Sequence, residues 1–219
     1  MTTDHRRDLV EQLTAARVIA VLRTDNTATA VAAARAIVAG GVRAIEVTMT
    51  VPNATDAIRQ IVANTTALVG AGTVLTADEV DHCIEAGARF IVSPTCCPDV
   101  IKRAKSHGTL VIPGAMTPTE VLAAWTLGAD MVKIFPASRL GPAFLSDLHG
   151  PLPDIPLVPT GGITDENALQ YLEAGATLVC VGSWLADRQS MAEGRFERLT
   201  ERARRIQAAV SGTVKEHHG

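Results

Sequence analysis

Lys133 is the residue best placed to perform chemistry, because its amine lies in the apolar stretch Met-Val-Lys-Ile-Phe. In a strand, Met131, Lys133 and Phe135 share one face. Val132 and Ile134 then face the covering layer. Burial on the inner face disfavours the ammonium form, and a neutral amine attacks a carbonyl carbon to form a Schiff base. The alternative is a lysine that reaches the rim or pairs with a carboxylate.

Glu46 is the second ionisable residue in an apolar stretch, Ala-Ile-Glu-Val-Thr. Strand alternation groups Ala44, Glu46 and Thr48 on one face. A buried carboxylate beside a buried amine suits aldol chemistry, in which the amine holds the carbonyl covalently and the carboxylate moves protons. A structural ion pair between Glu46 and Lys133 is the competing interpretation.

Two glycine-containing turns follow the last two predicted strands. They contain Thr160, Gly161 and Gly162 in one case and Gly182 and Ser183 in the other. Glycine lets a backbone approach a ligand closely, and backbone N–H groups at such turns bind phosphate. Tight-turn geometry alone explains a single Gly-Gly pair, but two such turns on adjacent strands favour a phosphate site.

Other candidate ligand-binding patterns are weak. The segment from Gly70 to Thr73 lacks the third glycine of a dinucleotide fingerprint, so we interpret it as a tight turn that presents Thr73. The six histidines lie in predicted helices or near the termini, and the four cysteines lack zinc-like spacing. We therefore expect no metal and no cofactor. Cys96 and Cys97 raise a redox possibility, but two reduced thiols at a helix start are the simpler interpretation.

Composition excludes several classes of protein. The chain has 219 residues, 47% of them hydrophobic and 20% charged, which is typical of a globular fold. Its formal net charge of -3 argues against a nucleic-acid partner. The absence of a long apolar run and of a signal-peptide core predicts no membrane association and a cytoplasmic location. The cysteine pattern fits a reducing compartment.

These residues need a scaffold in which short strands alternate with helices. Eight apolar runs predict strands, at residues 18–22, 44–47, 68–71, 90–92, 110–112, 131–135, 157–158 and 178–181. Helical spacing predicts helices at residues 3–14, 28–38, 54–63, 77–86, 99–107, 118–127, 142–148, 165–174 and 191–210. Most of the helices between strands end at glycine, the residue that an αβ turn favours.

The alternation predicts an α/β fold, namely a (β/α)₈ TIM barrel of one domain over residues 1–219 with an extra N-terminal helix. We divide it into an N-terminal helix (1–16), a barrel (17–187), a C-terminal helix (188–211) and a tail (212–219). A doubly wound sheet is the alternative. In a barrel, the ends of the strands meet around one axis, so the polar residues found there should form one site.

The strand-end motifs together resemble one family. They are Glu46-Val47-Thr48, Gly70-Ala71-Gly72-Thr73-Val74, Phe90-Ile91-Val92-Ser93-Pro94, Pro113-Gly114-Ala115-Met116-Thr117-Pro118, Lys133-Ile134-Phe135-Pro136-Ala137 and Pro159-Thr160-Gly161-Gly162-Ile163. In this order, from about Leu9 to Asp187, the chain resembles the class I 2-keto-3-deoxy-6-phosphogluconate (KDPG) aldolases, which overlap with the 4-hydroxy-2-oxoglutarate (KHG) aldolases.

The resemblance implies a homotrimeric TIM barrel without a metal that cleaves a small phosphorylated keto acid to pyruvate and glyceraldehyde 3-phosphate. Lys133 would form the Schiff base and Glu46 would be the general acid and base. The residues implied to bind substrate are Arg23, Thr48, Thr50, Thr73, Pro94, Phe135 and Thr160. The residues implied to bind phosphate are Gly161, Gly162, Gly182 and Ser183.

One position departs from much of the family. Thr50 stands where many members carry an arginine for the substrate carboxylate, and Arg23 or backbone amides near Thr73 are the possible replacements. The alternative functions are a 4-hydroxy-2-oxoglutarate aldolase, a sugar-phosphate isomerase or synthase on the same barrel, and a non-catalytic trimeric scaffold. The last two do not need a buried lysine and glutamate together.

Overall fold

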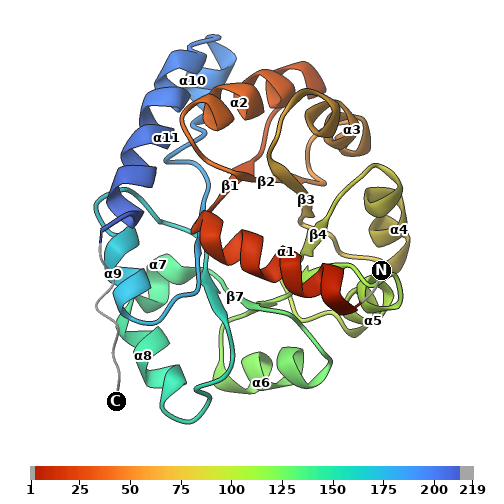
Figure 1. Ribbon diagram of the computed structural model, residues 1–219, viewed down its shortest axis with the longest axis vertical. Helices are drawn as coiled ribbons and strands as arrows, with labels where there is room; N and C mark the ends of the chain where they lie inside the picture. The colour runs from red at the N-terminus through yellow and green to blue at the C-terminus, as the bar shows by residue number, and fades with distance from the viewer. Residues whose placement is uncertain (1–2, 213–219) are drawn as a thin grey trace.

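A ring of parallel strands surrounded by helices makes up the computed structural model, which describes residues 3–212 (Figure 1). The strands are β1 (Val18–Leu22), β2 (Ala44–Thr48), β3 (Leu68–Gly72), β4 (Phe90–Val92), β5 (Leu110–Ile112), β6 (Gly114–Ala115), β7 (Val132–Ile134), β8 (Leu157–Pro159) and β9 (Val179–Val181). The helices are α1 (Thr3–Ala16), α2 (Thr27–Ala39), α3 (Ala54–Asn64), α4 (Ala77–Glu85), α5 (Pro98–Ser106), α6 (Pro118–Thr126), α7 (Ala137–Leu140), α8 (Ala143–His149), α9 (Ala168–Glu173), α10 (Arg188–Ala192) and α11 (Phe196–Val210).

The strands form two parallel sheets, ordered β5-β4-β3-β2-β1-β9 and β6-β7-β8. Backbone contacts join them at both edges. At one edge, the Lys133 amide donates to the carbonyl of Pro113 at 2.8 Å. At the other, Thr160 bridges Cys180. The fold is therefore α/β and TIM-barrel-like, with the carboxyl ends of all strands at one end of the ring.

Two predicted elements are divided in the structure. The strand predicted at residues 110–112 continues as β6 after Pro113, which has no amide hydrogen to donate to a ladder. The prediction of one C-terminal helix was wrong, because α10 ends before Gly194 and α11 begins at Phe196. Gly194 has a φ of 68°, in the left-handed region that an α-helix excludes. The predicted tail from residue 213 onward lies outside the described residues.

The predicted strand alternation is confirmed by the packing. Ala44 and Met131 belong to an interior cluster that also contains Phe90 and Ile112. Residues of the opposite strand face, including Ile45, Val132 and Ile134, pack with the helices in a separate outer cluster. Leu9, Leu13 and Ala16 of α1 join the interior cluster, and α1 lies across the ring (Figure 1). This helix closes the end of the ring opposite the strand carboxyl ends.

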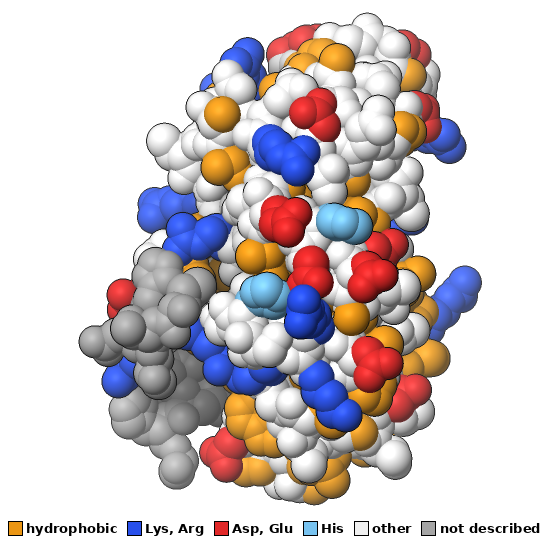
Figure 2. Space-filling model, turned by 90° about the vertical axis from the view of Figure 1, so that its right-hand side faces the viewer, with side chains coloured by type: hydrophobic (Ala, Val, Ile, Leu, Met, Phe, Trp, Pro, Cys, Tyr) orange, Lys and Arg blue, Asp and Glu red, His pale blue; other side chains and the backbone are white. Residues whose placement is uncertain are grey.

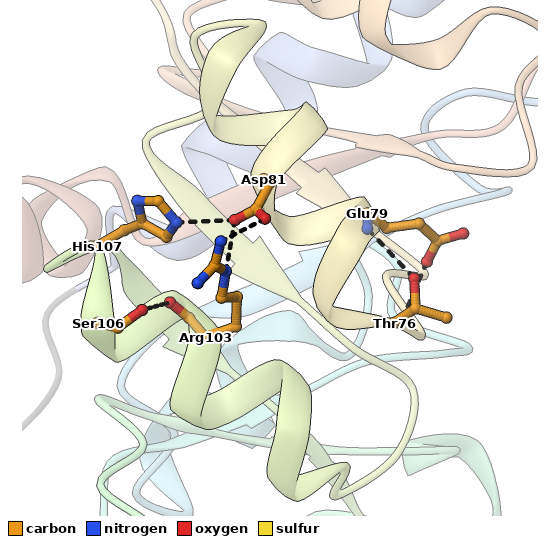
Figure 3. Close-up of polar contacts among 6 residues, drawn as sticks. All are labelled: Thr76, Glu79, Asp81, Arg103, Ser106 and His107. Carbon is orange, nitrogen blue, oxygen red and sulfur yellow. Dashed lines mark hydrogen bonds and ion pairs between the residues drawn. The ribbon is translucent and has the colours of Figure 1, made fainter.

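Local sequence fixes where α4 and α6 begin. The Thr76 hydroxyl accepts a hydrogen bond from the Glu79 amide (Figure 3). The Glu79 carboxylate accepts from the Thr76 amide in return, which completes a capping box. Thr117 and Glu120 repeat this arrangement at α6.

On the side of the ring that carries α4 and α5, acidic and basic side chains are interspersed (Figure 2). Between residues 3 and 212, no helix combines the length and apolar character of a membrane span.

Candidate active site

Lys133 lies on β7 with its side chain inside the ring. The residue is 6% exposed, and its Nζ lies 5.1 Å from the centroid of the Phe135 ring. Among the described residues, Nζ has no ion-pair partner, so the direct Lys133–Glu46 ion pair considered from the sequence is absent. A buried amine that no carboxylate engages is chemically available to a ligand.

Glu46 lies on β2 and is 1% exposed. Its Oε2 is buried and has no hydrogen-bond partner in the described structure. Burial raises the pKa of Glu46, and the charges of Lys133 and Arg23 oppose this shift only in part. The Glu46 carboxyl group therefore binds a proton more tightly than an exposed carboxyl does, which makes its ionised form a stronger base, and it lies within electrostatic range of Lys133.

Gly70 and Gly72 explain how the ring accommodates these side chains. A Cβ on Gly72 would lie less than 3.0 Å from Oε1 of Glu46, and a Cβ on Gly70 would overlap the Phe90 ring. Both glycines belong to β3, so our interpretation of this segment as a tight turn was incomplete. The turn itself is at Thr73, whose φ is 57°.

Arg23, the last residue of β2 (Thr48) and Thr50 lie at the open end of the ring. Arg23 is exposed, and its guanidinium has no hydrogen bond or ion pair within the described part of the chain. Thr48 is buried and its hydroxyl donates to the Leu22 carbonyl at 3.1 Å. The Thr50 hydroxyl lies 2.8 Å from that of Thr48, so it is directed toward its neighbour at the edge of the site.

Pro94, Phe135 and Thr160 complete the predicted pyruvyl pocket. Phe135 is 39% exposed and lies over Lys133, whereas Thr160 is 7% exposed. The Pro94 carbonyl packs so closely on Gly114 that a side chain there would overlap it. A Cβ on Gly161 would lie 3.6 Å from the Phe135 ring, which places the β8 turn beside this pocket.

The glycine turn after β8 has a left-handed backbone conformation, which favours glycine. Gly161 and Gly162 have φ values of 98° and 75°. The Asn167 side chain fixes this turn: its Nδ2 donates to the Gly162 carbonyl and its Oδ1 accepts from the Thr164 amide, both at 2.9 Å. Sequence reasoning missed Asn167, although an asparagine a few residues after Gly-Gly is a common turn-fixing signal.

After β9, a helical turn begins at Gly182, whose carbonyl accepts hydrogen bonds from the Leu185 and Ala186 amides at 2.9 and 3.0 Å. The amides at the start of such a turn have no acceptor within it. Gly182 is half-buried and Ser183 is exposed. These turns from neighbouring strands face the same open end as Lys133.

Cys180 is another residue whose place the sequence did not reveal. It is buried, and it lies inside the ring rather than under the helices. Burial raises the pKa of its thiol to about 12, and Glu46 adds to the shift while Lys133 and Thr160 oppose it. Its alternation with Leu178 and Gly182, which flank β9, was the available signal. Cys96 and Cys97 are free and half-buried just before α5.

Among the described residues, no group of three or more histidine, cysteine, aspartate or glutamate side chains is arranged to hold a metal ion. The site instead combines an unpaired amine, an unpaired carboxyl oxygen and an exposed guanidinium. This set can form a Schiff base with a keto group, move a proton beside it and bind an anion.

Comparison with known proteins supports this chemistry. A family model described as KDPG and KHG aldolase matches residues 9–202. A 2-dehydro-3-deoxy-phosphogluconate aldolase of Treponema pallidum (strain Nichols) is 40% identical over 196 residues, which are 88% of this chain and 92% of the relative. The KHG/KDPG aldolase of Escherichia coli (strain K12) is 37% identical over 194 residues, 88% of this chain and 91% of the relative.

Among solved structures, the KDPG aldolase of Legionella pneumophila, with pyruvate captured at low pH as a covalent carbinolamine intermediate, matches with a TM-score of 0.84. The two chains are 29% identical, and the match covers 90% of this chain and 97% of the other. A carbinolamine is the adduct that an amine forms with a keto group before water leaves. From the family model and these relatives, the chain belongs to the KDPG and KHG aldolase family.

Proposed function

We propose that this chain is a class I aldolase that cleaves 2-keto-3-deoxy-6-phosphogluconate to pyruvate and glyceraldehyde 3-phosphate. The observation that carries the proposal is the unpaired amine of Lys133, buried at 6% exposure in the same interior as Glu46. Family membership supports it, whereas a sugar-phosphate isomerase or a non-catalytic scaffold leaves both buried ionisable groups without a use.

The reaction begins when the neutral Lys133 amine attacks the C2 keto carbon of the substrate. The carbinolamine loses water to give a protonated Schiff base, which accepts electrons. Glu46, ionised, then removes the proton of the C4 hydroxyl, the C3–C4 bond breaks, and its electron pair passes into the Schiff base to give an enamine. Glyceraldehyde 3-phosphate leaves, a proton returns to C3, and water releases pyruvate from Lys133.

The binding roles follow from the chemistry of each group. Arg23, an exposed cation whose guanidinium makes no hydrogen bond or ion pair within residues 3–212, is the group we assign to the substrate carboxylate in place of the arginine that Thr50 replaces. Thr48, Thr73 and Pro94 shape the pocket around the pyruvyl carbons. Further lining residues are Phe135 and Thr160, and the phosphate lies against the backbone of Gly161, Gly162, Gly182 and Ser183.

Borohydride trapping tests the covalent step. Incubation with pyruvate and borohydride should attach one reduced pyruvyl group to each chain, and peptide mass analysis should locate it on Lys133. Lys133→Ala should abolish labelling, whereas Lys102→Ala, which removes an exposed lysine of α5, should keep it. Labelling of another lysine in the wild-type chain would falsify the assignment.

The second candidate activity is cleavage of 4-hydroxy-2-oxoglutarate to pyruvate and glyoxylate, which is favoured by the E. coli relative named for both activities. The values of kcat/KM for the two substrates separate the candidates. Several charge-assisted hydrogen bonds to phosphate, each contributing about 1.5–3 kcal/mol, predict a preference of two or more orders of magnitude for the phosphorylated substrate. Equal values of kcat/KM for the two substrates would mean that the chain is better described as a 4-hydroxy-2-oxoglutarate aldolase.

The finer features of the fold and assembly are part of this proposal. We take the chain as one domain, a full (β/α)₈ barrel to which α1 is added, and place it in the cytoplasm as a homotrimer. Leu122 and Trp125, 48% and 37% exposed on one face of α6, supply an apolar surface for a second copy. Light scattering should give a trimer mass that falls when Leu122 is changed to glutamate.

A further inference from the structure

Two arginines of α11 contact the loops that follow β8 and β9. Nη1 of Arg202 donates to the Trp184 carbonyl at 2.7 Å and to Oδ2 of Asp187 at 2.6 Å. Nε of Arg205 donates to Oδ2 of Asp165 at 2.8 Å. Trp184 directly follows Ser183, and Asp165 lies three residues after Gly162. Each arginine is therefore bound to the chain just beyond one of the two glycine turns.

The indole ring of Trp184 completes the connection between these contacts. The guanidinium carbons of Arg202 and Arg205 lie 5.9 and 5.6 Å from its centroid, within the range of cation–π attraction. The two arginines are three residues apart, so they project from one side of α11. Arg205 therefore contacts both loops, because it binds Asp165 in the loop after β8 and its guanidinium lies over Trp184 in the loop after β9.

Low exposure separates the Arg202–Asp187 pair and the Asp165 carboxylate from ordinary exposed ion pairs. The side chains of Arg202 and Asp187 are 24% and 25% exposed, and that of Asp165 is 14% exposed, although its partner Arg205 is 54% exposed. The pKa of Asp187 is lowered. Burial alone would raise this pKa, but hydrogen bonds from Ser190 and the charges of Arg202 and Arg198 outweigh the effect of burial and keep the carboxyl ionised. The ion pair is therefore present throughout the neutral pH range.

We propose that Arg202 and Arg205 are positioning residues that hold the two glycine turns at the spacing required to bind the substrate phosphate. The inference rests on the proposed function. Neither turn contains a lysine or arginine, so phosphate binding there depends on backbone amides. Backbone donors cannot adjust as a long side chain can, and their relative position decides whether they reach the phosphate oxygens together.

The test compares Arg205→Gln and Arg202→Gln with the wild-type chain. Each should raise KM for the phosphorylated substrate and lower its kcat/KM about tenfold or more, since an ångström of misplacement costs up to about 10²-fold. The kcat/KM for 4-hydroxy-2-oxoglutarate should stay within about twofold, because that substrate carries no phosphate. The inhibition constant of inorganic phosphate should rise in parallel.

A matched control is available on the opposite side of the ring. Arg103 of α5 donates to Asp81 of α4 through two hydrogen bonds of 2.7 Å, and His107 joins the same carboxylate (Figure 3). Arg103→Gln breaks an ion pair of the same kind far from α11 (Figure 1). It should leave both substrates and phosphate inhibition unchanged.

The results distinguish failure of this inference from failure of the proposed function. Equal loss on both substrates, or no loss on either, would show that the arginines only stabilise the fold and would overturn the inference. Absence of any wild-type preference for the phosphorylated substrate would overturn the phosphate site and the inference with it. Pyruvate trapping on Lys133 reports separately on the Schiff base.

A double-mutant cycle tests whether Arg205 acts through Asp165. Asp165→Asn should add little to the effect of Arg205→Gln on kcat/KM, and full additivity would contradict action through this pair.

Discussion

Replacement of Gly72 by alanine tests whether the room above β3 sets the position of Glu46. Gly72 lies in an extended strand, so alanine brings no backbone strain. Its Cβ, however, would overlap Oε1, Cδ and Cγ of Glu46. Restoring van der Waals contact requires the carboxylate to withdraw by about 1 Å or more. A displacement of that size in a proton-transfer group predicts a fall in kcat of about 10²-fold.

The same overlap has a cost in stability. Overpacking of a filled interior costs about 1–3 kcal/mol, and each kcal/mol lowers Tm by about 2–4 °C in a chain of this size. In a Glu46→Ala background, the overlap is gone, so the added Gly72→Ala change should no longer lower Tm. Gly150→Ala is the control, because a Cβ there meets only the Asp147 carbonyl, at 3.5 Å.

Two measurements on the same preparations test both effects of Gly72→Ala. Pyruvate release from the phosphorylated keto acid gives kcat, and thermal unfolding gives Tm. A Gly72→Ala chain with wild-type kcat would refute the claim that this glycine positions Glu46. Persistence of the stability cost in the Glu46→Ala background would locate the strain elsewhere in the ring.

Two other variables, the charge of Glu46 and metal content, give further predictions. Glu46→Gln should lower kcat by about 10²-fold or more, measured on the same substrate, because an amide cannot carry the proton. Since burial raises the pKa of Glu46, the stability of the wild-type chain declines as pH rises through that pKa. Glu46→Gln has no charge to bury, so its Tm should exceed the wild-type Tm at about pH 8, and this gain should shrink toward about pH 4. A gain that grows in acid would reverse this sign. Exhaustive EDTA treatment should leave activity intact, because the amine of Lys133 performs the activation that a divalent ion would otherwise supply; loss of activity restored by zinc or magnesium would contradict it.

The interior of the ring was predictable because strand alternation is a rule of period two. One charged residue in each of two apolar runs, Lys133 and Glu46, sufficed to orient those strands, and both side chains lie inside. The glycines that end helices were equally readable, as Gly87 and Gly175 show with φ values of 101° and 102°. These features depend on neighbours along the chain, which the sequence displays directly.

The break between α10 and α11 was not predictable by the same means. An isolated glycine within a helical pattern is tolerated, so Gly194 did not interrupt the apolar spacing of residues 191–210. The structure breaks there because Gly194 adopts a left-handed conformation and the Arg195 amide returns to the Ser190 carbonyl at 2.8 Å. Only packing of the following helix against its neighbours selects this conformation over a continuous helix.

Contacts between distant segments were the remaining gap, and Gly72 shows why. A glycine two residues after another glycine and directly before a threonine suggests a turn, since local conformational freedom is the property visible in sequence. In the structure, the relevant property is the missing Cβ, whose place is taken by a carboxylate from the neighbouring strand. Thr48 of β2 is paired with Gly72 of β3, and Glu46 with Gly70, so the demand for glycine comes from the register of two strands. The site residue and the residue that makes room for it must therefore change together.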